Sequence, residues 1–240
     1  MSRERIDEVP ARLPSGRHGL PREYVVNSQR ARLLRAAVQI GGATGYASMT
    51  VSAIIREARV SRKTFYELFE DREDIFLAAY DRLTAQAIHA MRDAYAVDGA
   101  WPERLCRMLR DGLDALASHP REARFCFVEV LAAGPRALAR RSATMRTFTE
   151  FLAPGYEIAG AARPRIPALM PDAIVGALNE VLYEHVVSER TAELPDLLPD
   201  LLYCALAPFL GPLEASERAA AAIDAIGGRA ALAMSSRTRA

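Results

Sequence analysis

Cysteine is scarce in this 240-residue chain, which has only three: Cys106, Cys126 and Cys204. They are widely spaced and odd in number, whereas a disulfide framework or a zinc site needs paired cysteines at short, regular spacings. We therefore expect no disulfide framework and no metal site. Each cysteine is interpreted as a small buried apolar residue of a protein in a reducing compartment.

Long hydrophobic runs are also missing. The longest, near Leu201 to Leu210, is too short to cross a bilayer and contains Pro208. The N-terminal segment is polar and charged, unlike a signal peptide. Beyond Ala96 no stretch alternates polar and apolar residues as a strand does. We expect an all-α protein of the cytoplasm that does not interact with membranes.

Lysine is the rarest of the charged residues: Lys63 is the only one, and all other basic residues are arginine. The charge is unevenly distributed. Residues 1–72 hold 13 Arg and Lys against 8 Asp and Glu, whereas residues 73–240 hold 18 against 22. Half of the chain is hydrophobic and a quarter charged, as in soluble globular proteins. A basic N-terminal third on an acidic remainder suggests that the first part meets a polyanion.

The stretch from Thr50 to Arg72 contains two short amphipathic patterns with a break between them. In the first, apolar residues recur at the spacing of one helix face, and Thr50 is placed to cap its start. The break follows at residues 58–60. Two short helices joined by about three residues form a helix-turn-helix.

The second of these helices would start at Ser61, a suitable N-cap, and would bury Phe65, Leu68 and Phe69. On the opposite, solvated arc lie Arg62, Lys63 and Tyr66. Such a cationic helix can enter a major groove. The alternative is a plain solvated surface in an ordinary helical protein.

The stretch from Arg30 to Asp74 contains a set of residues at characteristic spacings: Arg30, Leu34, Ala36, Ala37, Gly45, Thr50, Val51, Ile54, Ile55, Ala58, Val60, Ser61, Thr64, Phe65, Tyr66 and Phe69. In these residues the chain resembles the DNA-binding domain of the tetracycline-repressor (TetR) family of bacterial transcriptional regulators. There are two departures. The family usually has glycine in the turn where this chain has Arg59, so either the turn differs or a non-glycine residue adopts a left-handed conformation. Leu68 stands where a histidine often follows the recognition-helix tyrosine.

We interpret the protein as a homodimeric repressor that binds a palindromic operator in double-stranded DNA and is released by a small, largely apolar effector of unknown identity. Arg62 and Lys63 would face base edges. Phosphates would be held by Thr50, Thr64, Tyr66 and Arg72, with Ser61 in the same DNA-binding set. The competing interpretation is a helical small-molecule-binding protein or enzyme in which the N-terminal helices are only structural.

Pro, Gly and charge patterns divide the chain into four parts. We expect a basic arm over 1–26, a helix-turn-helix domain over 27–74, a helical effector-binding and dimerisation domain over 75–226 and a loose tail over 227–240. The arm either enters a minor groove or is a solvated tail. Glycines 41, 42 and 45 follow a helix, so they are interpreted as a helix end and turn. Beyond the long helix that starts near Asp71, helices are expected over 101–117, 120–132, 135–155, 168–189, 195–210 and 214–226.

Large apolar side chains in the second domain could line a cavity between helices, although aromatic residues at helical spacing are more often plain core. The resemblance to TetR proteins is what implies an effector pocket. The expected lining is Trp101, Met108, Phe125, Phe127, Glu129, Met145 and Phe148.

By the same resemblance, two C-terminal helices are expected to pair with their copies in a dimer. Glu180, Glu184, His185 and Glu189 are the nearest thing to a catalytic cluster, but no matching set occurs elsewhere, so we expect no enzyme, no catalytic residue and no cofactor. The expected dimer interface is Ile174, Leu178, Val181, Leu182, Leu198, Leu201 and Leu202.

Overall fold

The computed structural model describes residues 21–222, and within them residues 162–164 by their backbone only. All regular elements in this range are helical, and no strand occurs among them, as the sequence predicts. Most of the expected arm (1–26) and the whole expected tail (227–240) lie outside the described residues. No helix between residues 21 and 222 has the length and hydropathy needed to span a membrane.

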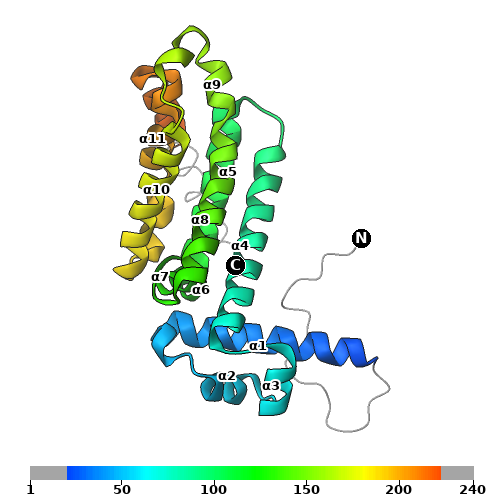
Figure 1. Cartoon of the computed structure of the whole chain (residues 1–240). Coiled ribbons are helices and arrows are strands. Elements are labelled where there is room, and N and C mark those ends of the chain that lie inside the picture. Colours follow the sequence, from blue (N-terminus) through cyan, green and yellow to red (C-terminus); the bar gives the residue numbers. More distant parts are fainter. Residues whose placement is uncertain (1–20, 223–240) are drawn as a thin grey trace, which may run out of the picture.

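Three helices form a small unit, which we call the head: α1 (Arg22–Thr44), α2 (Val51–Ala58) and α3 (Arg62–Leu68), with the 3-10 turn η2 (Tyr46–Ser48) between α1 and α2. Helix α1 begins five residues before the expected start at 27, so residues 22–26 are helical rather than part of an arm. Figure 1 shows α1 lying across the base of the molecule above α2 and α3.

Helix α4 (Arg72–Ala96) leads out of the head and runs along the rest of the molecule (Figure 1). Its N-cap is Asp71, whose carboxylate accepts a hydrogen bond of 2.8 Å from the Asp74 amide. Glu73 and Asp74 lie in the first turn, where negative charge is favoured by the helix dipole. Both features were expected from the sequence.

The remaining helices form the body, residues 101–222, and they run roughly alongside α4 (Figure 1). Two expected helices are interrupted. The one over 120–132 contains a π-helical turn, η3, and the one over 135–155 tightens at its end into 3-10 turns. Their bounds are α5 (Trp101–Ser118), α6 (Pro120–Arg124), η3 (Phe125–Glu129), α7 (Val130–Ala132), α8 (Pro135–Thr149), η4 (Glu150–Leu152), α9 (Pro154–Ile158), η5 (Gly160–Arg165), α10 (Met170–Val187), η6 (Thr191–Leu197) and α11 (Leu198–Leu210).

Proline and glycine set several helix ends in the body. Pro208 does not break α11, which continues to Leu210 and ends at Gly211 with a φ of 82°. Helical backbone then resumes over 212–222, close to the expected 214–226. Pro208 removes the N–H that residue 208 would donate to the Cys204 carbonyl, and the helix ends two residues later.

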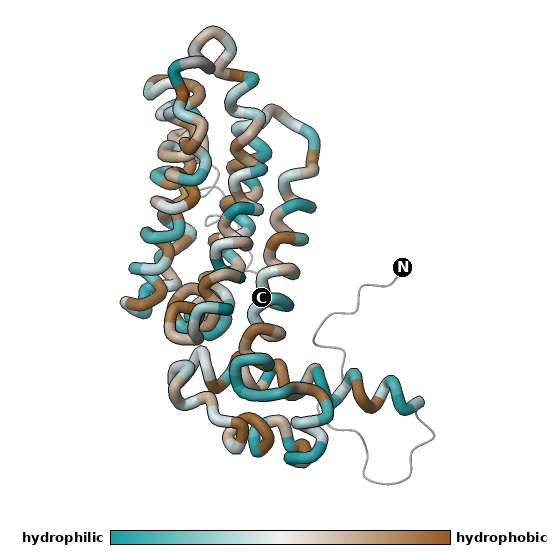
Figure 2. The backbone as a smooth tube through the Cα atoms, viewed as in Figure 1, coloured by the Kyte–Doolittle hydropathy of each residue, from teal (hydrophilic) through white to brown (hydrophobic). Residues whose placement is uncertain are grey.

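The buried side chains form two hydrophobic cores, one in the head and one in the body. The head core contains Phe65, Phe69 and Phe76, and it also takes in Phe125 and Val130 from the body. Figure 2 shows how hydrophobic and hydrophilic residues alternate along each helix, as amphipathic packing requires. Because Phe125 and Val130 belong to the head core, the two parts share buried surface near α6 and η3.

Candidate DNA-binding head and ligand cavity

The helix pair α2 and α3 is held by the two caps that the sequence predicts. The Thr50 hydroxyl accepts a 3.2 Å hydrogen bond from the Ala53 amide at the start of α2. At the start of α3, the Ser61 hydroxyl accepts one of 3.0 Å from the Thr64 amide. Each cap satisfies an amide that has no partner within its own helix.

The turn between the two helices contains Arg59 in the left-handed conformation, with φ 53° and ψ 49°. Of the two alternatives that the sequence left open, the strained one is therefore present. The Arg59 amide donates a hydrogen bond to the Arg56 carbonyl, and the Val60 amide donates one to the Ile55 carbonyl. From α1, the Arg32 guanidinium lies 3.5 Å from the Arg59 carbonyl oxygen and supports the turn from behind.

Helix α3 has one buried face and one exposed face. Phe65 is fully buried and Phe69 nearly so, whereas Arg62, Lys63 and Tyr66 are exposed. The Lys63 side chain is 86% exposed, and its only described ion pair is a 3.9 Å contact with Glu67 on the same helix. A surface pair of this kind contributes little, so the lysine is free to exchange it for another anion.

The predicted phosphate-binding residues are in different situations. Thr50 and Ser61 are exposed but act as caps, and the Thr64 hydroxyl lies 2.8 Å from the Ser61 hydroxyl. Tyr66 is 53% exposed. The Arg72 guanidinium lies 4.3 Å from the centre of the Tyr46 ring, and it donates a 3.4 Å hydrogen bond to a carbonyl of η2.

The body docks on the head through one face of α6 and η3. Residues 121, 125 and 129 lie four apart on this face, and each meets one glycine of the head. A Cβ on Gly42 would lie 2.2 Å from the Arg121 carbonyl oxygen, and one on Gly41 would lie 2.8 Å from the Phe125 ring. Glycines that the sequence indicates only as a helix end therefore allow close approach of the body.

Glu129 completes this junction. Its side chain is 7% exposed, and its carboxylate accepts a 2.6 Å hydrogen bond from the Tyr46 amide in the head. Arg124 lies 3.2 Å from the other carboxylate oxygen. A buried carboxylate needs such partners to offset its lost hydration.

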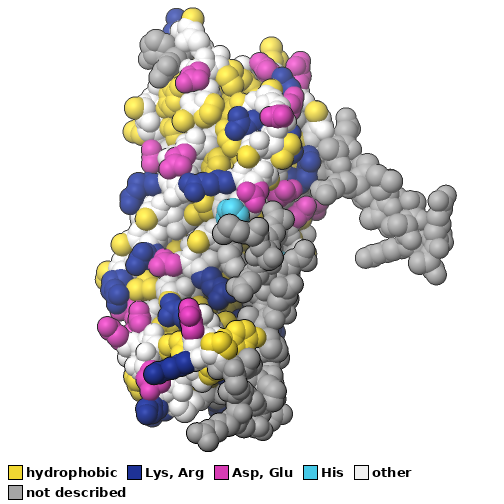
Figure 3. Space-filling view, turned by 90° about the vertical axis from the view of Figure 1, so that its right-hand side faces the viewer, with side chains coloured by type: hydrophobic (Ala, Val, Ile, Leu, Met, Phe, Trp, Pro, Cys, Tyr) yellow, Lys and Arg dark blue, Asp and Glu magenta, His cyan; other side chains and the backbone are white. Residues whose placement is uncertain are grey.

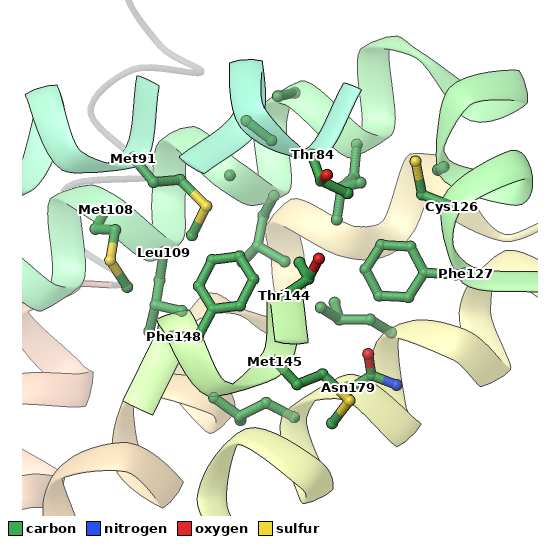
Figure 4. Close-up of a pocket in the computed structure, with 18 of the residues that line it drawn as sticks. Thr84, Met91, Met108, Leu109, Cys126, Phe127, Thr144, Met145, Phe148 and Asn179 are labelled. Carbon is green, nitrogen blue, oxygen red and sulfur yellow. The ribbon is translucent and has the colours of Figure 1, made fainter. Parts of the chain in front are cut away.

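A cavity of about 420 Å³ lies in the body, bounded by α4, α5, α6, η3, α8, α10 and α11. This volume is within the range of small-molecule sites. Four of the seven predicted lining residues are present: Met108, Phe127, Met145 and Phe148 (Figure 4). Leu178, Leu182 and Leu201, which were expected at a dimer interface, also line it.

The other three predicted lining residues lie elsewhere. Trp101 is buried at the far end of the body, where its indole N–H donates a 2.8 Å bond to the Phe151 carbonyl. Phe125 and Glu129 point into the head: the Phe125 ring centre is 4.4 Å from that of Phe76. In η3, residues 125 and 129 face the head while 126 and 127 face the cavity.

Several lining residues were not singled out from the sequence. On α4, Thr84, Ala87 and Met91 recur at helical spacing, which could have indicated a common face but not that this face borders a cavity. Thr144 and Asn179 add polar groups, both seen in Figure 4. Thr144 and Asn179 could have been predicted from the sequence as polar residues in the middle of a helix that have neither solvent nor a charged partner to face.

Burial changes the acidity of two groups beside the cavity. Desolvation raises the pKa of the Cys126 thiol to about 12, and the nearby Glu122 charge adds to this. Desolvation also raises the pKa of the Tyr80 phenol to about 12. Both groups are neutral at physiological pH, so Cys126 is not a reactive thiolate.

The predicted dimer interface is mostly internal. Ile174, Leu198 and Leu202 are buried in the body core, because both helices turn their leucine-rich faces inward. Only Val181 of the seven residues is exposed. The exposed residues of α10 include the small residues Ala173 and Ala177, which hydrophobic periodicity does not detect, together with Asp172, Glu180 and Glu184.

This architecture defines a helix-turn-helix protein with a ligand-sized cavity in a separate helical body. Residues 33–79 match the family model described as bacterial regulatory proteins, tetR family. The chain therefore carries the DNA-binding domain of the TetR family of transcriptional regulators, as its sequence resemblance implied. No curated protein matches the chain.

Solved structures share the fold over most of the chain. The fatty acid degradation regulator FadR from Bacillus halodurans has a TM-score of 0.66 at 20% identity, covering 74% of this chain and 94% of its own. FadR from Bacillus subtilis, solved in complex with stearoyl-CoA, has a TM-score of 0.61 at 18% identity, covering 75% and 97%. A TetR family regulator from Marinobacter aquaeolei VT8 has a TM-score of 0.61 at 18% identity, covering 78% and 97%.

Proposed function

We propose that this protein is a homodimeric repressor that leaves a palindromic operator when a small, largely apolar effector occupies the cavity of the body. The two-sided segment of α6 and η3 is the observation that best supports this. Its residues alternate between the cavity and the head, so a ligand that displaces one side displaces the other.

DNA binding is proposed for the exposed face of α3. Arg62 and Lys63 would contact base edges, and each good bidentate contact of arginine or lysine to guanine supplies about 1–3 kcal/mol of discrimination. Tyr66 would hold a phosphate. Arg72 would do so only by leaving the Tyr46 ring, since its guanidinium is held there in the described state.

We propose that effector binding in the cavity is coupled to the position of the head through η3. Phe127 faces the cavity, and the flanking Phe125 and Glu129 hold the head by packing and by hydrogen bonding. π-Helical turns are rare and frequently occur at functional sites. A ligand against Phe127 that favours a different position of η3 would shift Gly41 and Tyr46, and with them the head.

Dimerisation is proposed through the outward surfaces of α10 and α11. On α10, Ala173, Ala177 and Val181 are exposed, and a Cβ on Gly176 would meet no atom within 4 Å. On α11, Tyr203 is 38% exposed. Small residues let helices of two subunits approach closely, and two heads are needed because one helix-turn-helix contacts little DNA.

An apolar effector is proposed because most of the cavity lining is aliphatic, aromatic or methionine. The Bacillus subtilis FadR structure contains stearoyl-CoA, a ligand with a long apolar chain. A related chain-bearing molecule is the class that this cavity favours.

The proposal is tested with the full-length protein and DNA flanking its own gene. Light scattering should give twice the mass of the chain, and fluorescence anisotropy should show tight, salt-sensitive binding that specific DNA competes away better than random DNA. A panel of apolar compounds should then release the DNA. A protein that binds apolar compounds but no DNA would instead be a carrier or an enzyme with a structural head.

A further inference from the structure

The cavity has two chemically different ends. Figure 4 shows Met91, Met108 and Leu109 together at one end, with the hydroxyls of Thr84 and Thr144 nearer the other. Thr84 bonds the carbonyl of Tyr80, one turn earlier on α4, and so marks the part of the cavity closest to the head. A ligand that fits both ends would be amphipathic.

Tyr80 and Arg141 add to the polar end. Tyr80 is 2% exposed, and it lines the cavity together with Thr144. Arg141 lines the cavity from α8, is half-buried, and lies close enough for its charge to act on Tyr80. A hydroxyl donor and a guanidinium thus lie at the same end of the cavity.

Within residues 21–222, Arg141 has no carboxylate partner. The neighbouring Arg140 occupies the nearby acid, with its guanidinium 3.4 Å from the Asp81 carboxylate. The acidic residues of the lining lie on other helices: Asp111 is exposed, and the charge of Glu122 acts on Cys126 rather than on Tyr80. A half-buried cation has lost part of its hydration, so an anion from a ligand would be bound favourably there.

We propose that the effector is a medium-chain monocarboxylate whose carboxylate is bound by Arg141 and whose chain extends toward Met91 and Met108. This rests on the proposed function, in which the cavity is the effector site. A guanidinium binds one carboxylate through two parallel hydrogen bonds. The thioester of the same chain has no charge at that point and would leave Arg141 unpaired.

The cavity length sets the chain length. From Tyr80 to Met91 helix α4 rises by about 16 Å at 1.5 Å per residue, which suits an extended chain of about ten to twelve carbons. The test therefore uses dodecanoate, with dodecanol as the uncharged analogue and dodecanoyl-CoA as the thioester.

Binding is measured by calorimetry on the full-length protein and on two variants, Arg141→Gln and the matched control Arg140→Gln. The wild type should bind dodecanoate at least about 10-fold more tightly than dodecanol. Arg141→Gln should lose about 10- to 100-fold in dodecanoate affinity and keep its dodecanol affinity, which also shows that its cavity is intact. Arg140→Gln should keep both, since its ion pair with Asp81 is at the surface.

Equal affinity of the wild type for acid and alcohol would overturn the assignment, with no variant needed. So would unchanged dodecanoate binding by Arg141→Gln, or binding of the thioester without the acid. Operator release is measured separately. If dodecanoate binds through Arg141 but leaves the operator occupied, the proposed function fails while the carboxylate site stands. If only the thioester releases the operator, the carboxylate site fails while the proposed function stands.

Discussion

The head and the body use aromatic side chains in opposite ways. In the head core, Phe65 and Phe69 pack with Phe76 of α4 and support the short helix α3, whose outer face is polar. In the body, Phe127 and Phe148 border a cavity and leave it open. Apolar residues at helical spacing therefore indicate that a face is covered, but not whether protein or ligand covers it.

The surface of the body differs from that of the head as well. On the face shown in Figure 3, hydrophobic side chains gather over the part of the body farthest from the head. The exposed side of α3 instead presents Arg62, Lys63 and Tyr66. The exposed side of α3 is thus suited to nucleic acid, whereas this face of the body is not. The substitutions below test this difference.

Replacing both Arg62 and Lys63 by alanine should have the largest effect. Loss of two contacts to base edges should weaken operator binding by about 2–6 kcal/mol in total. Fluorescence anisotropy measures this, and the Arg146→Ala variant, which removes an exposed arginine of the body, is the control. Undiminished operator binding by the double variant would remove α3 from the DNA interface.

Phenylalanines 125 and 127 allow a direct comparison of the two regions. Phe125→Ala removes a fully buried ring that joins body and head, and should lower the free energy of unfolding by about 3–5 kcal/mol. Phe127→Ala enlarges a cavity that already exists, so its cost should be about 1–2 kcal/mol. Urea unfolding measures both; similar costs would mean that η3 does not divide its residues in this way.

Glu129→Ala should cost about 2–3 kcal/mol, because the Tyr46 amide and the Arg124 guanidinium both lose a buried acceptor. It should also reduce the effect of any effector on operator affinity. The control is Glu150→Ala, whose 3.4 Å ion pair with Arg92 is exposed and should be worth less than about 1 kcal/mol. If the two variants unfold alike, Glu129 does not join the two parts.

Arg59→Gly should have the smallest effect and should stabilise the protein, by about 0.5–1 kcal/mol, since glycine adopts a positive φ without strain. Calorimetry should show a melting temperature higher by about 1–4 °C. Glu189, with a φ of 58° in the body, offers the matched change Glu189→Gly. A lower melting temperature for Arg59→Gly would indicate that the Arg59 side chain makes contacts worth more than the strain.

The head was largely predictable, because its signals are local. Caps at Thr50, Ser61 and Asp71 each bond the amide three residues away, and the polar face of α3 follows from the 100° step of a helix. The conformation of Arg59 could be stated only as one of two alternatives. The family pattern has glycine there, and only the backbone shows which alternative holds.

The body was predicted as helices but not as a site. Met108 and Phe148 line the cavity, whereas Phe125 and Glu129, from the same stretch as Phe127, face the head. Residues 125 and 129 are four apart and share one helix face, whereas 127 lies about 200° from 125, so the spacing separates the two faces but does not tell which of them borders the cavity. The leucines of α11 were assigned to a partner subunit, but they fill the core of their own.

The amino-acid sequence by itself determined the all-helical class, the helix-turn-helix and the cationic face of α3, since each depends on residues within a few positions of one another. Only the tertiary structure decided that Glu129 bonds the Tyr46 amide, that Gly42 lies against Arg121, and that Arg141 lines the cavity. These pairings join residues far apart in the chain, and packing, rather than local propensity, brings them together.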